Sequence, residues 1–173
     1  MPYPPLWTDP FYLYHLCNNI LQFAASLLNP PPERLYVSHG PPPWDAGLDD
    51  SGCRSQLTVG VDRVRSSVQP TLNQLLPQGS KQTVPVADIE LTLLRCAVTM
   101  TGREIPGASI LDDEAQQLAM EGQALWGGLV TASMDGTLFP NMYTGQFIWR
   151  GMEAVGPNGG LAGWKMTLEV GLA

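Results

Sequence analysis

Proline and glycine interrupt this chain throughout, and they limit the length of any helix or strand that it forms. The sequence holds 18 glycines and 16 prolines among 173 residues. Proline removes a backbone donor and glycine favours turns, so we expect few regular elements joined by long loops. The length corresponds to one domain, and we predict a single domain over residues 1–173.

A helix is predicted over about residues 11–28, where apolar residues recur at three- and four-residue spacing. Thr8 or Asp9 is expected to cap it, Pro10 suits its first position, and Pro30 follows its end. The predicted buried stripe consists of Phe11, Tyr14, Cys17, Ile20, Leu21, Ala24, Leu27 and Leu28.

A second helix is predicted over about residues 112–134, with three acidic residues at its positive N-terminal end. Glycine costs about 1 kcal/mol in a helix relative to alanine, so three internal glycines indicate close approach to a sheet. These glycines are Gly122, Gly127 and Gly128. The predicted buried stripe consists of Ala115, Leu118, Ala119, Gly122, Leu125, Trp126, Leu129 and Val130.

Strands are predicted where apolar and polar residues alternate, most regularly from Trp164 to Leu172. Together with the helices they give an α+β fold: a mostly antiparallel sheet with two helices packed on one face and long loops rich in proline and glycine. The predicted strands are residues 34–38, 56–65, 86–98, 143–153 and 163–172, the last two forming a hairpin.

Three segments are expected to contact other chains: the N-terminal arm 1–10 and the long loops 39–55 and 66–85. Trp44 and Asp45 lie in the first loop, and a tryptophan in a loop is typical of a binding surface. Aromatic residues also gather before and within the first hairpin strand. We predict an interface that includes Trp44, Asp45, Tyr143, Phe147 and Trp149.

The charge content excludes several classes of function. Only 14% of the residues are charged and the net charge is −7, which argues against tight DNA binding and against disorder. No apolar run is long enough for a membrane span, and the N-terminus lacks a signal peptide. Three cysteines without paired spacing predict free thiols in a reducing compartment rather than a disulfide framework.

One group of residues is a candidate for metal chemistry. His39, Asp45, Asp49, Asp50 and Cys53 offer nitrogen, oxygen and sulfur ligands, which leaves a small metal-dependent enzyme as an alternative. Their spacing matches neither an EF-hand loop nor a zinc knuckle, and an acidic, solvated loop that faces a partner is the favoured interpretation. We therefore predict no catalytic, cofactor-binding or metal-binding residues.

Several motifs at turns and strand edges are Gly40-Pro-Pro-Pro-Trp44-Asp45, Gln56-Leu57-Thr58-Val59, Arg63-Val64-Arg65-Ser66, Leu93-Leu94-Arg95-Cys96, Val155-Gly-Pro-Asn-Gly-Gly160 and Leu168-Glu-Val-Gly-Leu172. These motifs resemble those of small neck and tail-joining proteins of long-tailed bacteriophages, particularly phages of actinobacteria. The similarity extends from about residue 34 to the end of the chain, and the element order resembles that of phage tail terminators.

The resemblance implies a structural protein of the virion, assembled in the host cytoplasm. A tail terminator forms a hexameric ring that caps the tail tube, stops its polymerisation and presents a surface for head attachment. The implied partners are the major tail tube protein and the neck or stopper proteins, with DNA passing through an acidic lumen without specific binding. A head-to-tail adaptor or stopper ring is the alternative.

Overall fold

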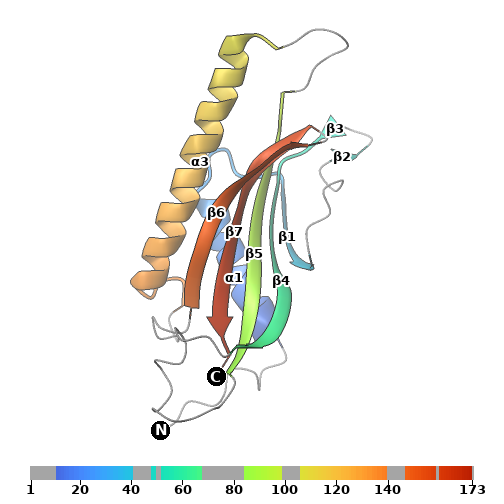
Figure 1. Ribbon diagram of the computed structural model, residues 1–173. Helices are drawn as coiled ribbons and strands as arrows, with labels where there is room; N and C mark the ends of the chain where they lie inside the picture. The colour runs from blue at the N-terminus through green and yellow to red at the C-terminus, as the bar shows by residue number, and fades with distance from the viewer. Residues whose placement is uncertain are drawn as a thin grey trace.

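The computed structural model describes residues 11–40, 48–49, 52–67, 84–98, 106–139, 147–158 and 160–172. Within these ranges two helices and seven strands follow one another (Figure 1). In chain order they are α1 (Tyr12–Ser26), β1 (Arg34–His39), β2 (Leu48–Asp49), β3 (Gly52–Cys53), β4 (Gln56–Ser67), β5 (Val84–Cys96), α3 (Ala108–Met134), β6 (Phe147–Asn158) and β7 (Leu161–Gly171).

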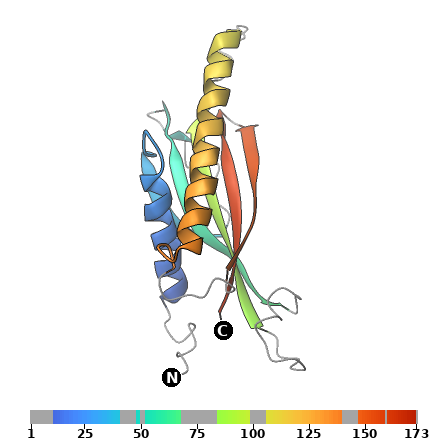
Figure 2. The same cartoon turned by 90° about the vertical axis from the view of Figure 1, so that its left-hand side faces the viewer.

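The predicted α+β class is confirmed. Five strands form one sheet in the order β1-β4-β5-β7-β6, in which β1 pairs in parallel with β4 and every other pair is antiparallel. The short strands β2 and β3 pair with each other. Both helices lie on one side of the sheet: α1 packs on β1 and β4, and α3 lies along β6 and β7 (Figures 1 and 2).

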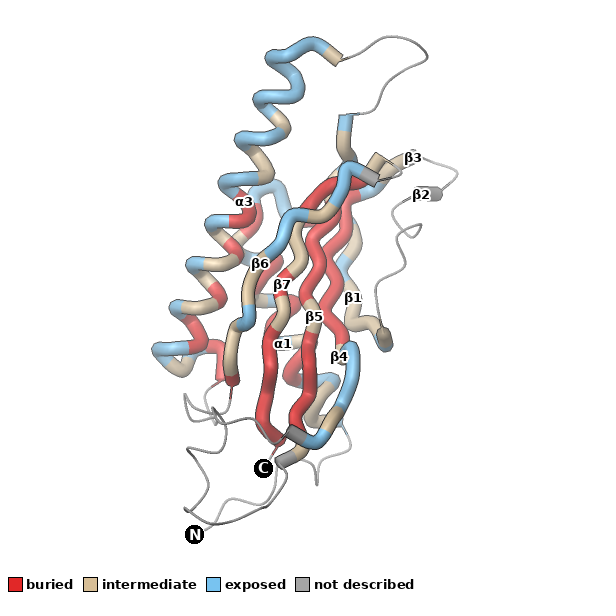
Figure 3. Tube along the Cα trace, in the orientation of Figure 1, coloured by how far each residue is buried: buried red, intermediate tan, exposed pale blue. Residues whose placement is uncertain are grey.

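Alternation along the central strands produces one apolar face and one polar face. On β5 the side chains of Ile89, Leu91 and Leu93 join the core, while Asp88 and Glu90 alternate with them. The same alternation on β7 was the most regular strand signal in the sequence. Figure 3 shows that burial is concentrated along β4, β5 and β7, which have a neighbouring strand on both sides.

The predicted stripe of α1 is wrong at its first turn. Phe11 and Tyr14 have relative exposures of 63% and 52%, whereas Leu16 and Ala25 are buried. Helical spacing allowed either set, because apolar residues surround the first two turns of this helix. The side of α1 that faces the core depends on where the helix meets β4 and β1.

The start of α3 also differs from the prediction. The helix begins at Ala108 after Gly107, so Asp112, Asp113 and Glu114 lie beyond its first turn and do not cap it. The first half of α3 extends past the end of the sheet, as Figures 1 and 3 show. Ala115 and Ala119 are therefore exposed, and burial begins at Glu121.

The three glycines of α3 have three different environments. A Cβ atom at Gly122 would lie 2.6 Å from the indole ring of Trp164 on β7, which confirms close approach to the sheet at that position. At Gly128 the neighbour is Leu27, which follows α1, so this glycine permits contact between helices instead. At Gly127 no atom lies within 4 Å, and the prediction of contact with the sheet is wrong there.

These environments predict opposite effects of the same substitution. Gly122→Ala should lower the free energy of unfolding by about 2 kcal/mol, because the added methyl group meets an indole that is fixed by its Nε1 hydrogen bond to the Leu118 carbonyl at 2.6 Å. Gly127→Ala should raise the free energy of unfolding by up to about 1 kcal/mol through helix propensity. Urea denaturation of both variants measures the difference, and equal effects would contradict these assignments.

Candidate interaction surfaces

The exposed side of α3 lacks charge over most of its length. Between residues 115 and 134 the sequence has one charged residue, Glu121, and its carboxylate is buried and paired with Arg95 at 2.8 Å. Met120 and Met134 are 61% and 72% exposed. The outer stripe of α3 is defined as the exposed residues Gln116, Met120, Gln123, Gly127 and Met134, which recur at three-, four- and seven-residue intervals.

Helix α1 also exposes a side without charged residues. Residues 12–26 include no aspartate, glutamate, lysine or arginine. The outer stripe of α1 is defined as the exposed residues His15, Asn19, Gln22 and Ser26. Sequence analysis treated both helices as core elements and missed these surfaces, although the absence of charge was visible in the sequence. The solvent-facing side of a helix normally carries charged or polar residues, and on these two stripes it carries no aspartate, glutamate, lysine or arginine.

The opposite face of the sheet is charged, and its charges pair with one another. Arg65 donates to Asp88 at 2.9 Å and to Glu169 at 2.6 Å, which links β4, β5 and β7. Arg63 also binds Asp88, and Arg150 of β6 binds Glu169. Arg63 and Arg65 therefore share an acceptor within their own chain.

The pKa values on this face follow from the pairing. Burial by itself raises the pKa of Asp88, but the hydrogen bonds from Arg65 and Arg63 outweigh it and hold that pKa below its usual range. The hydrogen bond to Asp88 raises the pKa of Arg65, and the hydrogen bond to Glu90 raises the pKa of Lys165. At neutral pH these groups are charged and compensated, so the face offers alternating signs rather than a basic patch for DNA.

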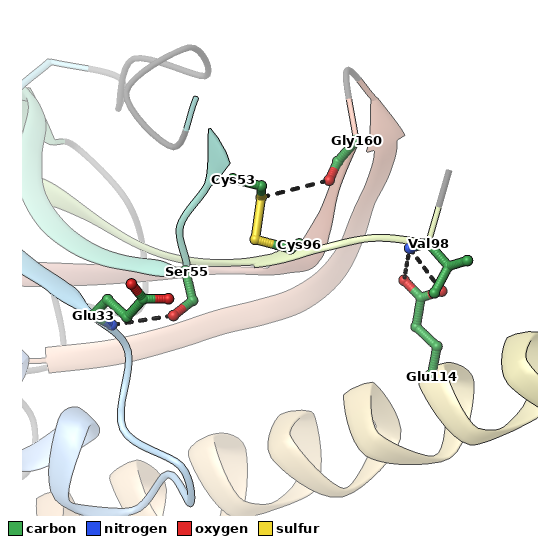
Figure 4. Close-up of a disulfide and its surroundings, with 7 residues drawn as sticks. All are labelled: Glu33, Cys53, Ser55, Cys96, Val98, Glu114 and Gly160. Atoms are coloured by element: carbon green, nitrogen blue, oxygen red, sulfur yellow. Dashed lines mark hydrogen bonds between the residues drawn. A yellow bond between two sulfur atoms is a disulfide. The ribbon is translucent and has the colours of Figure 1, made fainter. Parts of the chain in front are cut away.

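The expectation of free thiols is wrong for two of the three cysteines. Cys53 and Cys96 form a disulfide that joins β3 to the end of β5, and Cys17 is buried and free (Figure 4). The two cysteines are 43 residues apart in the sequence, and this separation does not indicate a disulfide. Only the pairing of β4 with β5 brings them together. The Sγ atom of Cys53 also approaches the carbonyl oxygen of Gly160 at 3.9 Å.

A pocket of about 310 Å³ lies beside this disulfide, between α3 and the chain that follows α1. Glu33 and Glu114 are at its border, and Glu114 accepts hydrogen bonds from the backbone N–H of Val98. Arg95 also lines the pocket, but its guanidinium is bound to Glu121 and to the Pro30 carbonyl. The hydrogen bonds of these groups tie α3 to β5 and to the turn after α1.

The predicted interface residues are placed differently from the expectation where the structure describes them. Phe147 is 8% exposed and packs on Phe139 with ring centroids 4.8 Å apart. Trp149 lies against the core and donates its Nε1 hydrogen to Ser133 Oγ at 2.9 Å. Phe147 is therefore part of the core of its own chain, and Trp149 is partly buried against that core; a contact of Trp149 with another chain stays a prediction. Trp44, Asp45 and Tyr143 lie outside the described residues.

The candidate metal set loses its sulfur ligand, because Cys53 is bonded to Cys96. His39 is exposed at the end of β1, and Asp45 and Asp50 lie outside the described residues. Among the described residues no three histidine, cysteine, aspartate or glutamate side chains are close enough to hold a metal ion.

The sequence matches no protein-family model, and no curated protein matches it either. In the described part of the chain, neither helix has the length and hydropathy needed to cross a membrane.

Proposed function

We propose that this protein is a structural subunit of a homo-oligomeric ring at the junction between the head and the tail of a long-tailed bacteriophage. In this role it caps the tail tube, ends tube polymerisation and allows head attachment. The observation that carries the proposal is an exposed stripe without charged residues on each helix, opposite a sheet face whose charges are paired. On α3 this stripe exposes Met120 and Met134, which form apolar surface that a neighbouring subunit would cover.

Two further observations support a ring through which DNA passes. The motif resemblance to phage neck and tail-joining proteins supports a location in the virion, with the major tail tube protein and the neck proteins as neighbours. The net charge of −7 is suited to a lumen that repels phosphate groups, so that DNA slides without specific binding. The ring is proposed to be a hexamer.

The first test is the oligomeric state of the full chain. Light scattering during size-exclusion chromatography should give a closed oligomer. Gln123→Glu, which puts a charge on the outer stripe of α3, should shift the protein toward monomers, because an unpaired charge buried at an interface costs several kcal/mol. Ser66→Glu is the matched control, since it adds the same charge at an exposed position on β4. Oligomers that tolerate both changes, or a monomeric wild type, would refute the proposal.

The second test distinguishes the terminator role from the adaptor role. Addition of the purified ring to polymerising tail tube protein should shorten the tubes seen by negative-stain electron microscopy. A ring that leaves tube length unchanged but binds the portal protein would instead be a neck adaptor or stopper.

A further inference from the structure

The pocket beside the disulfide lies where α3 runs past the end of the sheet (Figure 1). Its lining comes from three parts of the chain: the connection between α1 and β1, the start of β4 with the end of β5, and one side of α3. The residues of α3 are three and four positions apart, so they lie on one side of the helix. They are Glu114, Gln117, Leu118 and Glu121.

Two carboxylates of this pocket have no cation to compensate them. The guanidinium of Arg95 is bound to Glu121 at 2.8 Å, so these two charges cancel. Within the described ranges, neither Glu33 nor Glu114 forms an ion pair, and Figure 4 shows both carboxylates near the disulfide. Glu114 accepts the backbone N–H of Val98 at 3.2 Å, but a carboxylate has about four lone-pair sites and retains capacity for further donors.

Apolar side chains surround these carboxylates. Leu118 and Cys96 line the pocket. Ile110 and Leu111 precede Glu114 by four and three residues, which places them on the same side of α3, and they are 50% and 42% exposed. The α3 groove is defined as this pocket together with Ile110 and Leu111. Lysine and arginine lay their aliphatic stems on apolar surface of this kind while their charged heads bind polar groups.

We propose that the α3 groove binds a basic segment of a different protein, in which an arginine or lysine lies between apolar residues. The charged head pairs with Glu33 and Glu114, the aliphatic stem lies on Leu118, and the apolar neighbours cover Ile110 and Leu111. This inference goes beyond the proposed ring and does not depend on it, because it concerns a partner other than a second subunit.

Charge selects a different protein as the source of this segment. The chain has a net charge of −7, so acidic surfaces of two copies repel each other. Every arginine and lysine that the structure describes is already engaged within its own chain, and Arg63, Arg65, Arg150 and Lys165 are held by carboxylates of the sheet. A partner with unpaired basic residues gains charge-assisted hydrogen bonds that a second copy lacks.

Binding of fluorescein-labelled peptides to the full-length protein tests the inference. One peptide carries a single arginine flanked by leucines in a glycine and serine background, and the matched peptide has glutamine in place of the arginine. Fluorescence anisotropy at low ionic strength should show saturable binding of the arginine peptide, about tenfold tighter than that of the glutamine peptide. Added salt should weaken the binding of the arginine peptide.

A double variant locates the binding site. Glu33→Gln with Glu114→Gln removes both charges but keeps the side-chain shapes and an acceptor for the Val98 N–H. It should bind the arginine peptide about tenfold more weakly than the wild type. Asp62→Asn with Glu153→Gln is the matched control, since it removes two negative charges from side chains that are 45% and 69% exposed. The control should bind like the wild type.

Equal losses in the two double variants would show that the peptide responds to overall charge, which would overturn the inference. Equal affinity for both peptides, or no saturable binding of the arginine peptide, would also overturn it. Light scattering should find the same oligomeric state in Glu33→Gln with Glu114→Gln as in the wild type. A shift toward monomers would show that a second copy fills the groove, which overturns this inference and leaves the ring intact. A monomeric wild type that binds the arginine peptide would refute the ring alone.

Discussion

Loss of the Cys53–Cys96 disulfide should lower the free energy of unfolding by about 4 kcal/mol, because the bond closes a loop of 43 residues and restricts the unfolded chain. The double variant Cys53→Ser with Cys96→Ser should unfold at a lower guanidinium concentration than the oxidised wild type. Wild-type protein treated with a reducing agent should behave like the double variant.

The double variant is also its own control, since a reducing agent should leave its unfolding curve unchanged. Thiol titration under denaturing conditions should find one free thiol, that of Cys17, in the oxidised wild type and three after reduction. A wild type that shows three thiols without reduction, or whose stability is indifferent to reductant, would contradict the prediction.

Replacement of Asp88 should have the next largest effect. Its side chain is 4% exposed and accepts hydrogen bonds from both Arg63 and Arg65. Asp88→Asn keeps the size of the side chain but removes its charge, which leaves the two guanidinium groups without their shared counter-ion. We expect a loss of about 3 kcal/mol in the free energy of unfolding, measured by urea denaturation at neutral pH.

Glu153→Gln is the matched control for Asp88→Asn. The Glu153 carboxylate is 69% exposed and lies 4.0 Å from Lys165, so its loss should cost less than about 0.5 kcal/mol. Similar losses in the two variants would show that burial of Asp88 contributes nothing.

The lowered pKa of Asp88 predicts how the free energy of unfolding depends on pH. The pKa of Asp88 in the folded protein lies below its ordinary value of 3.8. Its contribution is therefore complete above pH 3.8 and is lost as the pH falls through the lower pKa of the folded state. Between these two values the wild type should lose stability on acidification faster than Asp88→Asn, as thermal melts at stepped pH would show. Parallel curves would contradict this assignment.

Much of the architecture was predictable because it depends on local patterns. The alternation from Trp164 to Leu172 identified β7, and the periodicity after Tyr12 identified α1, since each pattern gives an element one apolar side. The side of a helix that faces the core was harder to predict from the sequence. Phe11 and Tyr14 had the correct spacing but are exposed, while Tyr12 and Leu13 beside them pack against the core.

Residues expected at an interface illustrate a second limit. Phe147 and Trp149 were assigned to contacts with other chains because their positions suggested that one small domain has no room for them. In the fold, Phe139, which follows α3, packs on Phe147, and Ser133 near the end of α3 accepts a hydrogen bond from Trp149. The lack of charge along α1 and along residues 122–134 of α3 was visible in the sequence, but the exposed fraction of each residue is needed to distinguish a surface from a core.

The sequence by itself determined the α+β class, the approximate positions of the helices and strands, and the lack of charge along α1 and along residues 122–134 of α3. These properties follow from local periodicity and composition. Only the tertiary structure decided that Cys53 meets Cys96, that Asp88 is shared by two arginines, and that half of α3 extends past the sheet. The physical reason is that each of these depends on the register between strands and on where a helix crosses the sheet, and long-range pairing sets both.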